Sequence, residues 1–573
     1  MRLARRLSIA LLLLFVLGIA FCALSPDEPS IESGSTLLID VEGSYVESAV
    51  SPLLAKLLGS ESRPFISLLS LLAKAARDDR IETVVLRVAG ADIGWGKAEE
   101  LRAAIGRLRE AGRRTVAYLE VGTISAHREY FIAVAADEVH IVPGGVVPLV
   151  GLAAEYFYLG GMFEKLGIDF EVAKAGRYKS AVEMVAGTGM SEASREMANA
   201  LLDSTDRQFV AAIAEGRGLT PDEVRERIER GPVLASGLVT LGLADGVAHL
   251  DELLASLGGE VVRDEVYAGV GLESIGFDPQ ATFALVYGSG NVVVGDSATN
   301  SQGDPVFAAG AFAKALEQAA KVAGVGAIIV RIDSPGGSAL ASELMWRAIR
   351  KVRAESDKPI IASFSDVAAS GGYYVASAAD EIVASGASIT GSIGVFALLP
   401  VVEGLLANIG VESELLLRGP YADLGGGSRP MSDGARARLQ RIVLSTYDQF
   451  LERVAIGRKL ETAEVAAVAK GRVWTGEQAF ERGLIDGLGG LHEAVVRAKL
   501  ANGLDAAADV AIVVYPPQKT LPEQIAELLD ARLAKAAGAR VFLPGALGRL
   551  QRLVAGLPTE TLLLVPPAMI EIR

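Results

Sequence analysis

The chain repeats itself, and this internal duplication constrains its fold more than any other feature of the sequence. The segment YFIAVAADEVHIV, which begins at Tyr130, resembles YYVASAADEIVAS, which begins at Tyr373, 243 residues later. Three further pairs of similar segments occur in the same order, at separations between 241 and 244 residues. Chance is a poor explanation for four ordered matches, which predict two copies of one folding unit.

Each copy alternates apolar, strand-like runs with helical stretches. In the second copy, the runs GAIIVRID at 326–333 and PIIASF at 359–364 are predicted strands, separated by a helical stretch from about 339 to 355. A small-residue segment opens another helix near Ser370, and EIVAS follows as a strand. Nearly continuous apolar strands that alternate with helices are typical of parallel sheets buried on both faces. The predicted fold class is α/β, with two tandem parallel-sheet units.

The pattern divides the chain into four segments. The two copies cover about 35–270 and 271–505, with an N-terminal segment at 1–25 and a C-terminal extension at 506–573. The extension has a helix-like part and an apolar end that the sequence does not assign. Half of the residues are hydrophobic and 22% are charged. This is ample apolar material for a core, and it excludes a disordered chain.

The N-terminal segment has the composition of a membrane anchor or a signal peptide. Three arginines lie within residues 1–6, and the eighteen residues Leu7–Leu24 are apolar and uncharged. This length is at the border between a signal-peptide core and a spanning helix, so a cleaved signal and a buried soluble helix are alternatives to an anchor. We expect an uncleaved anchor. Its basic flank should stay cytoplasmic, which places the rest of the chain outside.

Charge and residue counts argue against several functions. The net charge of −15 would repel nucleic-acid phosphates, and no basic stripe reverses it, so we expect no nucleic acid as a partner. The chain has one cysteine, Cys22, and four histidines, of which no two lie at metal-ligand spacing. We therefore expect neither a disulfide framework nor a metal site.

One serine stands where a nucleophile could work. Ser370 lies between small residues, after a predicted strand and at the start of a predicted helix. Small neighbours let a substrate approach, and free N–H groups at a helix start can hold an oxyanion. The turn DSPGGS at 333–338 follows the neighbouring strand, so its glycine amides can point into the same crevice. The alternative is that these small residues only allow close packing.

The duplication strengthens the functional interpretation. The position equivalent to Ser370 in the first copy is His127, so the first copy lacks the serine. Conversely, Lys179 belongs to the first copy, and the equivalent position of the second copy is Ala422. Each copy therefore keeps something that the other has lost, which fits a composite site with a lysine from one copy and a serine from the other. The alternative for Lys179 is an ordinary surface lysine.

A lysine can serve such a serine only if it is neutral. A hydroxyl is a poor nucleophile until a base takes its proton, and a lysine with its ordinary pKa near 10.4 is charged at neutral pH. Burial lowers the pKa of a lysine and makes the neutral amine available. The amine still needs orientation, for which Ser392 is a candidate, since its first-copy counterpart is Leu149.

These motifs together resemble one known family. The segments are GRYKSAVE (176–183), RIDSPGGS (331–338), AASGGYY (368–374), TGSIGV (390–395) and GRVWTGEQAFERGLIDGLGGL (471–491). Over about 36–500 the chain resembles the long, duplicated form of the signal peptide peptidase A family, peptidase family S49. The resemblance implies a Ser/Lys peptidase with a ClpP/crotonase-like fold. It also implies a homotetramer anchored in the bacterial inner membrane and facing the periplasm, which degrades cleaved signal peptides.

The resemblance also implies roles for individual residues. Lys179 would be the general base, Ser370 the nucleophile and Ser392 the residue that steadies the base. Gly337 and Gly371 would supply the oxyanion amides. The implied reaction is amide hydrolysis through an acyl-enzyme, with apolar peptides as substrates and with no metal or cofactor.

Three other functions are alternatives. A Ser-His-Asp hydrolase would pair Ser370 with His127, although these occupy equivalent positions of the two copies. A non-catalytic membrane scaffold would not need Ser370 at all. A crotonase-like acyl-CoA binder would need a cytosolic site and a basic nucleotide pocket, and the N-terminal segment argues against the first.

Overall fold

A computed structural model describes most of the chain. The described residues are 28–47, 62–122, 126–300 and 304–517, with the backbone of 563–564 and 571–572. The predicted anchor at 1–25 and most of the predicted C-terminal extension lie outside these residues. Among the described residues, no helix has both the length and the apolar character needed to cross a bilayer.

The first copy forms a seven-stranded sheet in which every pair of strands is parallel. In sheet order its strands are β2 (Arg63–Pro64), β1 (Ser35–Val46), β3 (Ile81–Asp92), β4 (Arg114–Leu119), β5 (Glu138–Ile141) and β8 (Gly246–Val247), and β9 (Val261–Arg263) also pairs with β1. Val84 and Val85 of β3 point to opposite faces, yet both are fully buried. The expectation of parallel strands buried on both faces is confirmed for this sheet.

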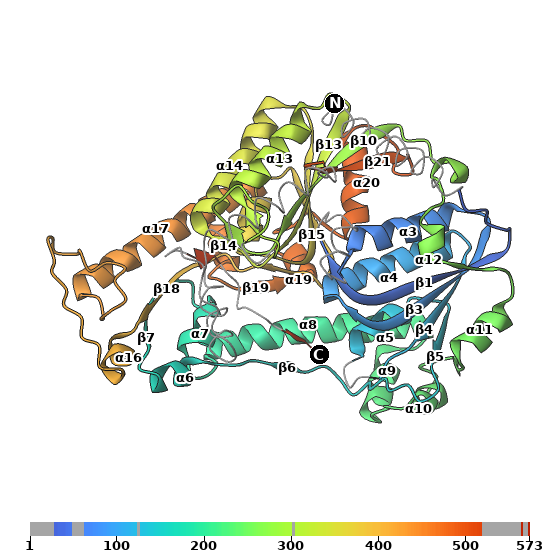
Figure 1. Cartoon of the computed structure of the whole chain (residues 1–573), viewed down its shortest axis with the longest axis horizontal. Helices are drawn as coiled ribbons and strands as arrows, with labels where there is room; N and C mark the ends of the chain where they lie inside the picture. Colours follow the sequence, from blue (N-terminus) through green and yellow to red (C-terminus); the bar gives the residue numbers. More distant parts are fainter. Residues whose placement is uncertain are drawn as a thin grey trace, which may run out of the picture.

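Helices cover both faces of the first sheet. Helices α3 (Phe65–Arg77), α4 (Trp95–Glu110) and α5 (His127–Ala133) pack on one face, where Leu72 and Leu101 join the main core of this copy (Figure 1). On the other face, Leu253 of α11 (Leu250–Leu257) packs against Val85 and Val116. The remaining helices of this copy are α6 (Gly160–Lys165), α7 (Ala181–Ala186), α8 (Glu192–Arg217), α9 (Pro221–Glu229), α10 (Ala235–Thr240) and α12 (Asp264–Tyr267), with a 3-10 turn at Glu273–Ile275.

The second copy, together with the start of the predicted C-terminal extension, forms an eight-stranded sheet. Its strands are β10 (Ala281–Ser289), β13 (Val325–Ser334), β15 (Ile360–Ala369), β16 (Glu381–Ala384), β17 (Ile389–Gly391), β19 (Val473–Thr475), β20 (Gly487–Leu488) and β21 (Val510–Tyr515). All pairs are parallel except β17 with β19. The predicted strands at 326–333 and 359–364 are β13 and β15, and the predicted helix between them is α14 (Ala339–Glu355).

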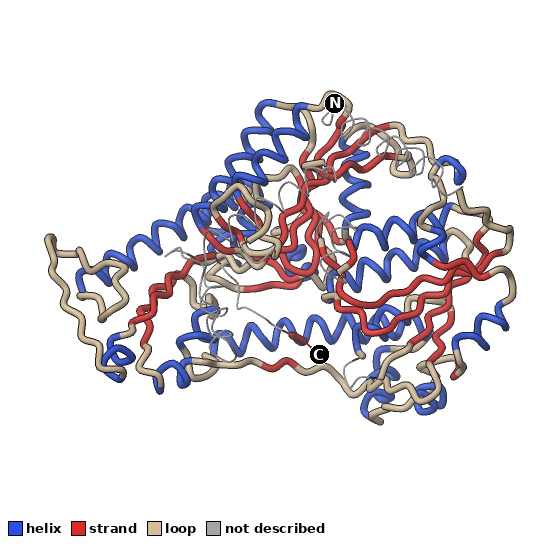
Figure 2. The backbone as a smooth tube through the Cα atoms, in the orientation of Figure 1, coloured by secondary structure: helices blue, strands red, loops and turns tan. Residues whose placement is uncertain are grey.

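The helices of the second copy also lie on both faces of its sheet. Helices α13 (Ala309–Lys321), α14 and α15 (Gly371–Ala376) pack into the large core on one face, and α20 (Leu491–Ala501) packs on the other. The remaining helices are α16 (Glu403–Asn408), α17 (Asp433–Arg458), α18 (Thr462–Val468) and α19 (Gly476–Glu481). Figure 2 shows this alternation of strands and helices in both copies.

Equivalent contacts confirm the duplication in three dimensions. The hydroxyl of Tyr130 donates to the carbonyl oxygen of Leu243, and that of Tyr373 donates to the carbonyl oxygen of Leu484, each at 2.7 Å. The long helices α8 and α17 have 26 residues each. The two repeats therefore share internal packing as well as sequence.

A third sheet joins the two copies. Its strand order is β12 (Phe307–Ala308), β11 (Val292–Val293), β14 (Gly337–Ser338), β22 (Leu563–Leu564), β18 (Val395–Val401) and β7 (Asp169–Ala175). Strand β7 of the first copy runs antiparallel to β18 of the second, and Figure 1 shows the two side by side. A two-stranded pair, β6 (Ala154–Glu155) with β23 (Glu571–Ile572), completes the described strands. The third sheet brings the segment after β7 to the second copy.

Candidate active site

The structure brings Lys179 of the first copy to Ser370 and Ser392 of the second. The Lys179 Nζ lies 2.7 Å from the Ser370 Oγ. It also lies 2.9 Å from the carbonyl oxygen of Ser392 and 3.0 Å from its Oγ. All three residues are fully buried. The composite arrangement expected from the duplication is therefore present in the geometry.

The pairing of β7 with β18 carries Lys179 across to the second copy. The loop after β7 is fixed where the N–H of Tyr178 donates to the carbonyl oxygen of Lys470 at 2.9 Å. Gly471 makes this approach possible, because a Cβ there would lie 2.6 Å from the Lys179 backbone nitrogen and its φ is +78°. Only glycine fits both the space and the backbone conformation.

Two serines of the site have positive φ angles, which are rare for residues other than glycine. Ser370 has a φ of 54° and precedes α15, and its N–H donates to the carbonyl oxygen of Gly391 at 2.8 Å. Ser392 has a φ of 52°, and its N–H donates to the carbonyl oxygen of Arg472 at 2.7 Å. Such conformations cost energy in non-glycine residues and cluster at functional sites, where the surrounding structure holds them.

Burial sets the protonation state of Lys179. Desolvation lowers the pKa of this amine well below its ordinary value, and no carboxylate among the described residues offsets that effect. Its hydrogen-bond partners are hydroxyl and carbonyl oxygens, none of which carries a charge. The structure therefore favours a neutral amine beside a serine hydroxyl, the state that a general base requires.

The two glycines proposed for the oxyanion site lie side by side. A Cβ on Gly371 would be 3.1 Å from the backbone nitrogen of Gly337 and 3.2 Å from the Gly336 Cα. Gly371 opens α15, where the first backbone N–H groups have no partner within the helix. Gly337 has a φ of +154° and its Cβ position is filled by the backbone of Val292, so no other residue fits there.

His127 does not take part in this arrangement. Its ring lies edge-on to Phe209 at 5.7 Å, in the core of the first copy, and only 5% of it is exposed. Neither ring nitrogen has a hydrogen-bond partner among the described residues, so neither is bonded to Ser370. Burial lowers the pKa of the imidazole. The geometry gives no support to a Ser-His-Asp arrangement.

A buried ionic cluster, which the sequence did not predict, joins the two copies. Its members from the first copy are Glu47, Lys97 and Glu100, and those from the second are Arg331, Asp333 and Asp366. The run GAIIVRID contains a feature from which the cluster could have been predicted, namely the charged Arg331. A charged residue inside an otherwise apolar strand must be buried, and a buried charge needs partners.

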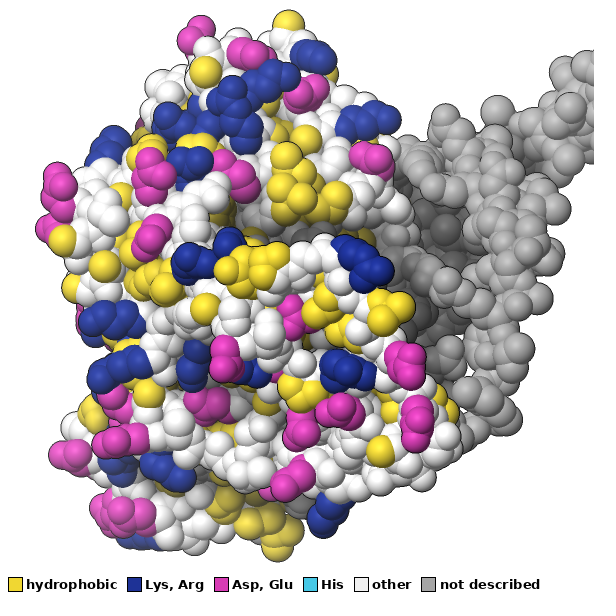
Figure 3. Space-filling view, turned by 90° about the vertical axis from the view of Figure 1, so that its left-hand side faces the viewer, with side chains coloured by type: hydrophobic (Ala, Val, Ile, Leu, Met, Phe, Trp, Pro, Cys, Tyr) yellow, Lys and Arg dark blue, Asp and Glu magenta, His cyan; other side chains and the backbone are white. Residues whose placement is uncertain are grey.

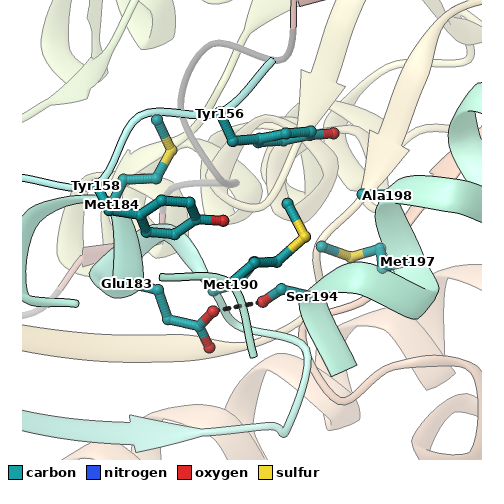
Figure 4. Close-up of a pocket in the computed structure, with 9 residues that line it drawn as sticks. Tyr156, Tyr158, Glu183, Met184, Met190, Ser194, Met197 and Ala198 are labelled. Carbon is teal, nitrogen blue, oxygen red and sulfur yellow. Dashed lines mark hydrogen bonds between the residues drawn. The ribbon is translucent and has the colours of Figure 1, made fainter. Parts of the chain in front are cut away.

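A methionine-lined pocket adjoins the segment after Lys179. It is a small, partly open hollow between the loop after β6, helix α7 and the start of α8. Its walls include Tyr156, Tyr158, Ser180, Glu183, Met184, Met190, Ser194, Met197 and Ala198. Figure 4 shows the methionine and tyrosine side chains around it and the hydrogen bond from Ser194 to Glu183. The pocket is adaptable, since methionine side chains repack easily.

An extended strand lies beside the candidate oxyanion site. Strand β22 runs antiparallel to both of its neighbours, with Leu564 paired with Gly337 of β14 and Leu563 paired with Phe396 of β18. The edges of β14 and β18 therefore accept an extended backbone between them.

Comparison with known proteins gives consistent matches over both copies. The sequence profile described as Peptidase family S49 matches residues 107–261 and 353–505. The chain is 35% identical over 463 residues to the chloroplastic serine protease SPPA of Arabidopsis thaliana, covering 78% of this chain and 68% of that protein. It is 29% identical over 525 residues to Protease 4 of Haemophilus influenzae, covering 85% of this chain and 82% of that protein.

Solved structures resemble the chain more weakly. A mutant of ClpP1 from Listeria monocytogenes aligns with 37% of this chain and 94% of its own at 10% identity, with a TM-score of 0.24. The α/β class with two parallel-sheet repeats is confirmed, while its likeness to ClpP and crotonase stays a prediction.

Proposed function

The chain belongs to peptidase family S49 and is a serine peptidase, and on that premise we propose that Ser370 is its nucleophile and Lys179 the general base. The observation that carries the proposal is the 2.7 Å separation between a buried lysine amine and a buried serine hydroxyl. Ser392 steadies the amine through its carbonyl and hydroxyl oxygens.

The reaction follows from these positions. The neutral amine of Lys179 takes the proton of the Ser370 hydroxyl as the oxygen attacks the peptide carbonyl carbon. The backbone amides of Gly337 and Gly371 stabilise the tetrahedral oxyanion, and each such donor is worth about 3–4 kcal/mol in related sites. The lysine ammonium then protonates the leaving amine, which leaves an acyl-enzyme. Lys179 next deprotonates a water molecule as it attacks the acyl carbon, and the resulting ammonium returns that proton to the Ser370 oxygen, which releases the acid and restores the serine.

We propose apolar peptides, such as the remnants of cleaved signal peptides, as substrates. The antiparallel place between β14 and β18 suits an extended peptide backbone, because main-chain pairing does not depend on sequence. The pocket beside Ser180 suits an apolar side chain, because three methionines and two tyrosines line it.

The proposed location is a bacterial inner membrane, with a single spanning segment at 1–25 and the peptidase on the periplasmic side. This rests on the arginines of residues 1–6 and the apolar run that follows them. Peptide fragments released into the membrane would then lie next to the enzyme.

We also propose a homotetramer. Exposed apolar residues between α16 and α17 support self-association, since Ile409 is 65% exposed and Leu416 is 82% exposed. Figure 3 shows this end of the molecule, where hydrophobic side chains are scattered among basic and acidic ones.

The proposal is tested by the hydrolysis of a fluorogenic apolar peptide by the full chain. Ser370→Ala and Lys179→Ala should each abolish turnover, whereas His127→Ala should retain it. Wild-type kcat/KM should rise with pH as Lys179 loses its proton, with a midpoint below the ordinary lysine value because burial lowers its pKa. Equal turnover by wild type and Ser370→Ala would refute the catalytic proposal and favour a scaffold.

A further inference from the structure

The two strands that end at the proposed active site are out of register just before they reach it. Strands β13 and β15 pair regularly up to Ile332 with Phe364, and the next pair is Ser334 with Ala368. Strand β15 therefore advances four residues where β13 advances two. An irregularity of this kind leaves backbone groups unpaired and re-aims the chain beyond it, and such bulges are common next to active sites.

Two carboxylates and one ammonium lie at this irregularity. The Asp333 Oδ1 accepts the N–H of Val367 at 3.1 Å, so a side chain replaces the missing ladder bond. The Lys97 Nζ donates to the Asp333 Oδ2 and to the Asp366 Oδ2, each at 2.6 Å. Lys97 belongs to the first copy and is 3% exposed, so the second copy is clamped by a residue from outside it.

The start of helix α4 is built to reach this place. The carboxylate of Asp366 accepts the N–H of Lys97 at 2.8 Å and that of Gly94 at 3.1 Å. A Cβ on Gly94 would lie 2.3 Å from the Asp366 Cγ, and a Cβ on Gly96 would lie 2.6 Å from the carbonyl oxygen of Ser365. The helix start therefore touches β15 directly, and two glycines make room for it.

Lys97 and Lys179 are both buried, but their surroundings differ. Burial alone would lower the pKa of Lys97, yet the attraction of Asp333, followed by that of Asp366, outweighs it and raises the pKa above the ordinary lysine value. Lys97 is thus a permanent cation and cannot act as a base. Its contribution is to hold two strands together.

We infer that Lys97 is a positioning residue for the nucleophile and the oxyanion amides. Asp366 lies four residues before Ser370, and Asp333 lies four residues before Gly337. One ammonium therefore fixes the ends of two strands, β15 and β13. The residues that follow them, Ser370 and Gly337, must both stand about 3 Å from the same substrate carbonyl. The inference rests on the proposed function, because it concerns the geometry of that site.

The test is Lys97→Met in the full chain, measured with the fluorogenic apolar peptide. Without the ammonium, two adjacent carboxylates repel each other and the strand ends move apart. A displacement of 1 Å in an active site can cost about 100-fold in rate, so we expect kcat to fall by about 100-fold. The KM should change much less than kcat, within about threefold of wild type, because peptide binding also uses β18 and the methionine-lined pocket, which Lys97 does not contact.

Lys74→Met is the matched control. Lys74 is another buried lysine of the first copy, 8% exposed. Its Nζ donates to the carbonyl oxygens of Tyr267, Ala268 and Val270. Its loss should lower the melting temperature without changing kcat, which separates positioning from general destabilisation.

A second variant covers the case in which Lys97→Met does not fold. Asp366→Asn keeps the shape of the side chain and removes one of the charges that Lys97 holds, so kcat should again fall with little change in KM. Wild-type kcat in either folded variant would overturn the inference. If Ser370→Ala is inactive in the same assay, such a result leaves the proposed function standing. If Ser370→Ala is active, the proposed function has failed instead.

Discussion

At the scale of single residues, the site places an amine where its charged form is unstable. The unfolded chain carries Lys179 as an ammonium at neutral pH, whereas burial without an opposing charge lowers its pKa in the folded chain. Folding must then release a proton, which costs free energy at every pH below the ordinary lysine pKa. The amine thus makes the folded chain less stable than an apolar side chain of similar length would.

We expect Lys179→Met to be inactive but more stable than the wild type at pH 7, with a melting temperature about 2 °C higher. Because the unfolded wild type binds the extra proton, wild-type stability rises with pH, and the difference should shrink as pH approaches 10. Thermal unfolding at pH 7 and pH 9.5 measures this. A wild type that is more stable at both values would contradict the assigned protonation state.

How well individual residues could be predicted depended on whether the two copies differ at them. Ser370 and Lys179 were found because each is missing from the equivalent place in the other copy. Lys97 and Arg331 were missed, because their partners belong to the opposite copy and lie more than 200 residues away in sequence. The pattern of apolar residues indicates that a strand is buried. It does not indicate which side chain of the other copy contacts that strand.

At the scale of elements, the central strands and helices of the second sheet were predicted, and the third sheet was not. The runs that form β13 and β15 are apolar, and a proline-glycine turn and a helix separate them, as expected. The pairing of β7 with β18 joins segments more than 200 residues apart. Strand β22 has only two residues, so it carries no periodic signal.

Strand β22 leads to a prediction about the rest of the chain. It occupies the place between β14 and β18 that we assign to substrate. Because β22 is part of the same chain, it competes with the substrate for this place at a high effective concentration. A protein that ends at residue 517 should show a KM for a short apolar peptide about tenfold lower than the full chain, with a similar kcat.

A synthetic peptide with the sequence of residues 558–573 is the control for that measurement. It should inhibit the shortened protein competitively. An unchanged KM after shortening, or no inhibition by the peptide, would show that β22 does not compete with substrate.

At the scale of the whole molecule, buried charges join the two copies. Arg331 is fully buried in the second copy, and its Nη2 donates to Glu47 at 2.7 Å and to Glu100 at 2.6 Å, both in the first copy. Its Nη1 donates to Ser363 Oγ and to the carbonyl oxygen of Phe364, each at 3.0 Å. Removing one member of such a group leaves buried charges without partners, which typically costs about 3–5 kcal/mol.

We therefore expect Arg331→Met to destabilise the protein by this amount and to weaken the link between the copies. Calorimetry should show one unfolding transition for the wild type and two for the variant, because each copy has its own core. Lys351→Met is a suitable control, since Lys351 forms an exposed ion pair with Glu317 within the second copy. A single transition at an unchanged temperature for Arg331→Met would refute the linking role.

The reach of β7 across the molecule has a consequence for how such a gene can change over generations. The front half has lost its own serine, yet it cannot be discarded, because its loop carries the only amine that stands beside Ser370 in the described residues. If Lys179 is the base and Ser370 the nucleophile, as we propose, a stop codon or deletion in either half should leave an inert product. Selection should then preserve both halves together, although only one of them supplies the proposed nucleophile.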